Sequence, residues 1–148
     1  AGCPPGGDLL GALAQRLDDP DPVRARRAAV AWSAYEQALA EPEAAPAIAP
    51  DVATADRLVR MYRVQAHYLR AGAFVSEAAF LDACAGLAGM PVTLIHGRLD
   101  RICPPDNARR VHACTPGSRL VWVDDCGHTP FHPRMVAAWR AALEDDRA

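Results

Sequence analysis

The sequence predicts an α/β protein in which a helical region, residues 1–89, precedes the last part of a doubly wound parallel sheet, residues 90–148. Up to about residue 90, apolar residues recur at helical spacing; beyond it, short β-branched runs alternate with helices. Strand, helix, strand and helix in close succession are typical of parallel βαβ packing. Because two parallel strands need cover on their edges and faces, we expect the rest of the sheet upstream of residue 1.

Four helices are predicted in the first region. Asp8 is a suitable N-cap for the first, and Pro22 suits the first turn of the second. A Pro/Ala-rich loop, residues 41–50, comes before the third helix, which Gly72 ends, and Ser76 caps the fourth. The predicted ranges are 8–17, 18–40, 51–73 and 76–89.

Two strands and two helices are predicted in the second region. The run P-V-T-L-I-H-G (91–97) is bounded by Pro and Gly, as a short buried strand is, and S-R-L-V-W-V-D (118–124) is the second such run. The helices are predicted at 105–114 and 132–145. Trp122 and Trp139 are expected to pack the last strand against the last helix.

Composition and charge exclude several classes of protein. The chain has 148 residues, 51% of them hydrophobic and 23% charged, which is typical of a soluble globular domain with its own core. The net charge of −2 argues against nucleic-acid binding. No apolar run approaches the roughly 20 residues of a membrane helix, and the first residues show no signal peptide. The five cysteines have no metal-site spacing, so we expect reduced thiols, a cytoplasmic protein, and no metal or cofactor.

An acid and a histidine follow the two predicted strands. Asp100 comes after the strand that ends at Gly97, and the pair Gly127–His128 comes after the next strand. Because catalytic groups gather at the carboxyl ends of parallel strands, the two side chains are expected to meet there. Acid before histidine is the second half of the Ser…Asp…His order of α/β-hydrolases. In that order the carboxylate orients the imidazole, which takes the proton of the nucleophile.

The nucleophile of such a triad is missing from the sequence. The serines are Ser33, Ser76 and Ser118, and none lies in a G-x-S-x-G elbow between a strand and a helix. Cys103 and Cys126 lie beside the acid and the base, but neither occupies an elbow. We expect the nucleophile and the oxyanion donors to lie upstream of residue 1.

Several segments resemble the proline iminopeptidases (prolyl aminopeptidases). H-G-R-L-D-x-x-C-P (96–104) followed by Gly-His is similar to the C-terminal signature of that family. P-P-x-x-D-L-L (4–10), A-W-S-x-Y-E (31–36) and Y-R-V-Q-A-H-Y (62–68) follow the order of its cap region. The resemblance implies the second half of an α/β-hydrolase with a helical cap. It also implies that Asp100 is the triad acid, that His128 is the base, and that Cys103 lies near the active site.

The resemblance also bears on the substrate. In this family, glutamates of the cap hold the free N-terminal amine, and Glu36 matches the first of them. Where the family usually reads R-I-E-x-H-Y, this chain reads R-V-Q-A-H-Y, so Gln65 stands in place of a second glutamate. A carboxylate gives an ammonium a charge-assisted bond, whereas an amide offers only a dipole. The other interpretation of Glu36 is a solvated carboxylate on a helix surface.

The predicted function is therefore a serine-type aminopeptidase that releases N-terminal proline from peptides. Its expected partners are a peptide with a free N-terminal proline and the missing N-terminal half of the same enzyme, and the fragment alone is predicted to be inactive. Two alternatives stay open. One is an esterase or amidase of the same fold with a different substrate, which Gln65 allows. The other is a truncated chain without catalytic function.

Overall fold

The computed structural model describes residues 7–41 and 48–145, which fall into two compact units. The first unit comprises residues 1–36 and 45–76, and the second comprises residues 37–44 and 77–148. Cys3 and part of the 41–50 loop lie outside the described residues. Among the residues that the structure describes, no helix is long and apolar enough to span a bilayer.

Three helices build the first unit, although residues 37–40 at the end of the second of them belong to the second unit. They are α1 (Leu9–Leu17), α2 (Pro22–Ala40) and α3 (Val52–Arg70). Asp8 caps α1 by accepting a hydrogen bond from the Gly11 amide at 2.7 Å, as the sequence predicted. Asp51 caps α3 in the same way through the Thr54 amide, also at 2.7 Å. These carboxylates satisfy amides that have no partner within the helix.

The core of the first unit combines small and large side chains. Leu17 of α1 is fully buried, and the aromatic rings of Trp32 and Tyr62 stack between α2 and α3 with centroids 4.7 Å apart. Alanines fill the closest approaches, since a methyl group lets two helices pack tightly. The buried alanines of this cluster are Ala14, Ala25, Ala28, Ala29 and Ala66.

Three helices are shorter than the sequence pattern indicated, and the second in the chain, predicted at 18–40, begins only at Pro22. The third ends at Arg70, and a 3₁₀ turn, η1 (Gly72–Phe74), follows it. Gly72, Ala73 and Phe74 all have left-handed backbone conformations, with φ of 58°, 53° and 60°. A right-handed helix cannot continue through such residues. The fourth helix, α4, is confined to Glu77–Ala85.

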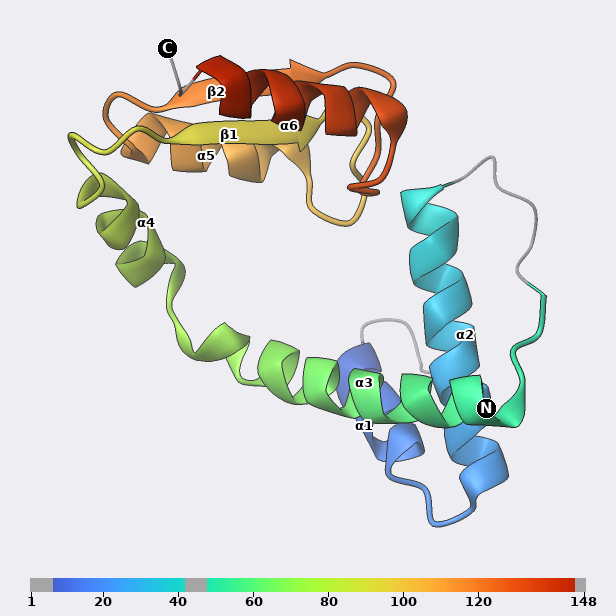
Figure 1. Ribbon diagram of the computed structural model, residues 1–148. Coiled ribbons are helices and arrows are strands. Elements are labelled where there is room, and N and C mark those ends of the chain that lie inside the picture. Colours follow the sequence, from blue (N-terminus) through green and yellow to red (C-terminus); the bar gives the residue numbers. More distant parts are fainter. Residues whose placement is uncertain (1–6, 42–47, 146–148) are drawn as a thin grey trace. The chain divides into compact units, whose positions relative to one another are not determined.

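The second unit contains a small parallel sheet with helices on both faces. Its strands are β1 (Thr93–Gly97) and β2 (Arg119–Val123), joined by α5 (Pro105–Cys114) and followed by α6 (Pro133–Asp145). The strands pair in parallel from Thr93 opposite Arg119 to Gly97 opposite Val123. In Figure 1, α5 and α6 lie on opposite sides of the two strands. The predicted βαβ arrangement is thus confirmed for these elements.

Strand alternation decides which side chains meet which helix. Ile95 and Val123 face α6, where they pack with Met135. His96 and Trp122 are register partners on the opposite face, and the guanidinium of Arg109 from α5 lies 5.0 Å from the Trp122 ring centre. The predicted packing of Trp122 against the last helix was therefore wrong. Trp122 precedes Val123 by one residue, so its side chain points to the other face.

The burial of Leu17 generates a stability prediction. Leu17→Ala should lower the free energy of unfolding by about 2–5 kcal/mol, because it removes buried methyl groups and leaves a cavity. Leu9→Ala on the same helix is the matched control, since Leu9 is 60% exposed, and its effect should stay within about 0.5 kcal/mol. Urea unfolding followed by circular dichroism measures both. Equal losses in the two variants would contradict the assigned core.

Candidate active site

The candidate site forms where the two parallel strands end. Beyond the last strand pair, the Arg98 amide donates to the Val123 carbonyl at 3.0 Å, and the Leu99 amide donates to the Cys126 carbonyl at 2.9 Å. These bonds join the loop that follows β1 to the loop that follows β2. Asp100 lies on the first loop and His128 lies on the second, so the joined loops bring them together.

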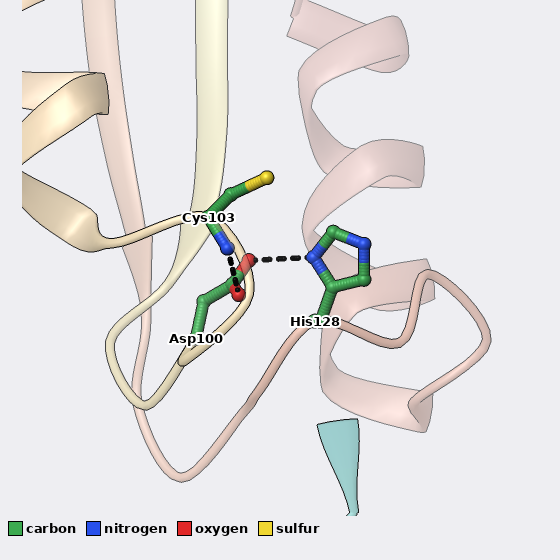
Figure 2. Close-up of side chains that lie close together, drawn as sticks. All are labelled: Asp100, Cys103 and His128. Carbon is green, nitrogen blue, oxygen red and sulfur yellow. Dashed lines mark hydrogen bonds and ion pairs between the residues drawn. The ribbon is translucent and has the colours of Figure 1, made fainter. Parts of the chain in front are cut away.

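The Asp100 carboxylate is buried and held by three donors. The residue is 7% exposed. Its Oδ1 accepts from the amides of Ile102 at 2.9 Å and Cys103 at 2.8 Å. Its Oδ2 is 2.9 Å from Nδ1 of His128, and a dashed line marks this interaction in Figure 2. The sequence-based expectation that this acid and this histidine make contact is therefore confirmed.

The contact also sets the hydrogen positions on His128. Oδ1 of Asp100 already accepts two amide hydrogens, which suits an ionised carboxylate, and such a group can only accept from Nδ1. Nδ1 of His128 therefore carries a hydrogen, and Nε2 of the neutral ring is left as the acceptor. The His128 side chain is 41% exposed while the Asp100 side chain is 6% exposed. A buried acid thus orients a base that solvent or substrate can reach.

Gly97 allows the two loops to approach each other. A Cβ at this position would lie 2.4 Å from the carbonyl oxygens of both Cys126 and Gly127. No side chain fits there unless the backbone moves. On the second loop, Asp125 has a φ of 54°, which helps turn the chain back after β2. Glycine in the H-G-R-L-D segment is therefore required by the close approach of the loop that carries His128.

His96 is a site residue that sequence reasoning missed. Its Nε2 lies 2.9 Å from the carbonyl oxygen of Cys103 and 3.7 Å from Oδ2 of Asp100. Since a carbonyl only accepts, Nε2 of His96 carries a hydrogen and fixes the loop around Asp100. The sequence feature that could have identified His96 is its position at the carboxyl end of β1, four residues before Asp100.

Two cysteines lie near the site, but neither has the properties of a nucleophile. Cys103 is exposed, yet partial enclosure of its thiol and the nearby Asp100 carboxylate raise the pKa of Cys103. Burial, followed by the Asp100 charge, likewise raises the pKa of the Cys126 thiol. A raised pKa keeps the thiol protonated, whereas the thiolate is the reactive form.

The side chains of Asp100, Cys103 and His128 also form a possible set of metal ligands. Their ligand atoms all lie within 4.8 Å of one another. Oxygen, sulfur and nitrogen donors of this kind can bind zinc. A metal bound through Asp100 and His128 would replace their hydrogen bond, so metal binding and proton transfer would compete for the same atoms.

The serines do not supply a nucleophile to this pair. Ser33 lies within α2 and Ser76 precedes α4. Ser118 precedes β2, at the amino end of the sheet, where its hydroxyl donates to the Thr115 carbonyl at 2.8 Å. His128 follows the carboxyl end of the same strand. None of the three stands on a turn from a strand to a helix, the position that a hydrolase nucleophile occupies.

The second group of predicted site residues lies in the first unit. Glu36 is half-buried and accepts three hydrogen bonds. Its Oε1 accepts from Nε1 of Trp32 at 2.8 Å and from Nε2 of Gln65 at 2.7 Å, and its Oε2 accepts from the Tyr62 hydroxyl at 2.9 Å. We call Trp32, Glu36, Tyr62 and Gln65 the Glu36 cluster. Glu36 is therefore not a merely solvated carboxylate on a helix surface.

The aromatic members of the Glu36 cluster both pack and donate hydrogen bonds. Trp32 and Tyr62 do stack, and each also donates its polar hydrogen to Glu36. The spacing of Trp32 and Glu36, four residues apart on α2, was the signal that could have found this contact. The contact from Tyr62 joins two helices and had no local signal.

Comparison with known proteins gives consistent relatives. The chain is 31% identical to the proline iminopeptidase of Xylella fastidiosa over 93% of its length, which covers 44% of that protein. It is 30% identical to the proline iminopeptidase of Xanthomonas citri and 28% identical to the probable proline iminopeptidase of Leptolyngbya boryana, each over 88% of the chain. The chain spans 41% to 44% of the length of these three curated relatives. No protein-family profile matches it.

The close approach at Gly97 generates a second prediction. Gly97→Ala should destabilise the second unit by about 1–3 kcal/mol and displace the loop carrying His128, because the added methyl group meets two carbonyl oxygens. The control is Gly86→Ala, where the new Cβ would meet one carbonyl oxygen at 3.2 Å. NMR of the His128 ring, together with urea unfolding, distinguishes the variants. An unchanged His128 signal in Gly97→Ala would rule out this role for Gly97.

Proposed function

Because the chain matches the C-terminal part of proline iminopeptidases, we propose that it supplies the acid and the base of a serine-type aminopeptidase that releases N-terminal proline from peptides. The observation that carries the proposal is the 2.9 Å hydrogen bond from His128 Nδ1 to the buried Asp100. It supports the proposal because it leaves the imidazole in the tautomer that a general base needs.

The proposed fold is the end of an α/β-hydrolase sheet, with residues 90–148 in the core and residues 1–89 as a helical cap. Two features support it. The parallel strands carry a helix on each face, as doubly wound sheets do. The apolar residues Leu94 and Ile95 of β1 are only half-buried, which suits a strand with further neighbours in a larger sheet.

In the proposed reaction, a serine hydroxyl attacks the carbonyl carbon of the N-terminal proline. Nε2 of His128 takes the hydroxyl proton, and Asp100 stabilises the imidazolium that forms. His128 then passes this proton to the leaving amine as the carbon–nitrogen bond breaks. A water molecule, deprotonated by the same nitrogen, releases proline from the acyl-enzyme and regenerates the serine.

The serine and the oxyanion donors would come from the N-terminal half of the same enzyme. No G-x-S-x-G elbow occurs within the 148 residues. The raised pKa values of Cys103 and Cys126 argue against a cysteine substitute. The second proposed partner is a peptide whose free N-terminal amine pairs with Glu36. The three donors around this carboxylate leave one of its roughly four acceptor positions for an ammonium.

Gln65 favours a second candidate function. An esterase or amidase of the same fold would not need two carboxylates for an amine, and Gln65 supplies an amide instead. The two candidates differ in one measurable property. The aminopeptidase depends on the charge of Glu36 for its free-amine substrate, whereas the esterase does not.

His128 generates the prediction for catalysis. In the intact enzyme, His128→Ala should lower kcat on a proline arylamide by several orders of magnitude without unfolding the protein, since the general base is lost. His67→Ala, at an exposed position on α3, is the control and should keep near-normal activity. Activity assays with circular dichroism test both. A folded His128→Ala enzyme with near-normal kcat would contradict the proposed triad.

Glu36 generates the prediction for substrate binding. In the intact enzyme, Glu36→Gln should raise KM for a free-amine proline substrate about tenfold or more, a loss of at least about 1.4 kcal/mol. The same change should leave an N-acylated or simple ester substrate nearly unaffected. A glutamine at 36 can still accept from Trp32 and Gln65 through its remaining oxygen, so the change mainly removes charge. Equal losses on both substrate types would show a structural role and favour the esterase.

A further inference from the structure

We infer that Gln65 is a positioning residue that orients the Glu36 carboxylate and leaves one of its acceptor positions for a cation. The identity of that cation as a substrate ammonium rests on the proposed function. The placement of Glu36 by Gln65 does not, because it follows from contacts within the first unit. A carboxyl group at position 65 would have to share a proton with Glu36.

Gln65 donates to one of the two carboxylate oxygens of Glu36. Its Nε2 donates to Oε1 of Glu36 at 2.7 Å, and the same oxygen accepts from Trp32 at 2.8 Å. Two donors fill the acceptor positions of Oε1. Oε2 accepts from Tyr62 alone among the described contacts, so the remaining acceptor position is on Oε2. Gln65 and Trp32 therefore fix one oxygen and leave the other to face a ligand.

An amide suits this position because it donates without carrying a proton that titrates. Two carboxyl groups at hydrogen-bond distance cannot both ionise, because their charges repel, so one of them stays protonated. Gln65 has the shape of that protonated acid and donates at any pH. Gln65 therefore donates to Glu36 without bringing a proton that the two groups would share.

The other two donors to Glu36, Trp32 and Tyr62, also keep their hydrogens over the working range of pH. Burial, with a smaller effect of the neighbouring Glu36, raises the pKa of Tyr62 to about 12, so its hydroxyl remains a donor over the working range of pH. The Trp32 indole does not titrate, and its stacking on Tyr62 with an interplanar angle of 20° fixes both rings. The Glu36 cluster is therefore arranged before any ligand binds.

Several other charged groups on these helices form ion pairs of their own. Tyr62 is the titratable group that contacts Glu36 directly. The remaining ion pairs among α1, α2, α3 and their connections lie between side chains of opposite charge. These pairs are Arg24–Asp19, Arg24–Asp21, Arg26–Asp56 and Arg63–Asp18. A change at position 65 therefore acts mainly through Glu36 and Tyr62.

The first test compares the pH dependence of stability in the chain and in Gln65→Glu. The shared proton raises the folded pKa of the new acid pair above the unfolded value of about 4.3. The variant should therefore be most stable, relative to the wild type, below that pH. It should lose melting temperature, by about 5 °C or more, as the pH rises through the raised folded value. Melting curves from pH 4 to pH 8 measure the difference.

Two variants control this test. Gln15→Glu adds the same charge at an exposed position on α1 and should show no such fall in melting temperature relative to the wild type. Gln65→Met keeps the length but removes the donor, so it should be less stable than the wild type at neutral pH, where the lost hydrogen bond is one to a carboxylate. A Gln65→Glu profile parallel to that of Gln15→Glu would overturn the inference, as would a Gln65→Met variant as stable as the wild type.

The second test separates this inference from the proposed function. In the intact enzyme, Gln65→Met should raise KM for a free-amine proline substrate several-fold while kcat for an N-acylated or ester substrate stays the same. If the stability results hold but KM is unchanged on every substrate, Gln65 still positions Glu36 and the ammonium assignment fails. If the stability results fail, the positioning role is wrong whatever the kinetics show.

Discussion

The parallel register of β1 and β2 is the constraint on which the candidate active site depends. Gly97 stands opposite Val123, so the two strands end at the same level and their loops leave the sheet side by side. Two backbone hydrogen bonds then join the loops, and the missing side chain of Gly97 gives them room to touch. The backbone alone brings Asp100 and His128 close together, so their side-chain contact is not needed to place them.

The two groups of candidate functional residues share one design. Asp100 and Glu36 each accept three hydrogen bonds, and in each case the donors decide what the carboxylate can do next. Around Asp100, two backbone amides fill one oxygen and direct the other to an imidazole. Around Glu36, neutral side chains do the same and leave one acceptor position open. Hydrogen bonds from several fixed donors hold such a carboxylate in one orientation.

Much of this arrangement could be predicted from local sequence. Helical periodicity, the Asp8 cap and the change of period near residue 90 correctly predicted the order and approximate bounds of the described elements. The acid and the histidine were predicted from their positions after consecutive strands. That prediction succeeds because the topology of parallel strands dictates which loops are neighbours.

The features that sequence missed depend on contacts that local patterns do not encode. The third helix ends just before Gly72, the predicted terminator, but Ala73 and Phe74 also adopt left-handed backbone, which propensities do not predict for these residue types. The face of the sheet on which Trp122 lies depends on the alternation of side chains along β2. A shift of one residue places a side chain on the opposite face. The bond from Tyr62 to Glu36 spans 26 residues, so only the packing of α2 against α3 reveals it.

The three tryptophans have a practical consequence, because each has a different environment. Trp32 is buried, stacked and bonded to a carboxylate in the first unit. In the second unit, the guanidinium groups of Arg98 and Arg109 each lie 5.0 Å from the Trp122 ring centre, whereas Trp139 is 44% exposed. Indole emission responds to its surroundings, so chains that keep a single tryptophan would give each unit its own optical signal. The protein thus carries built-in fluorescent reporters that can follow the two units separately.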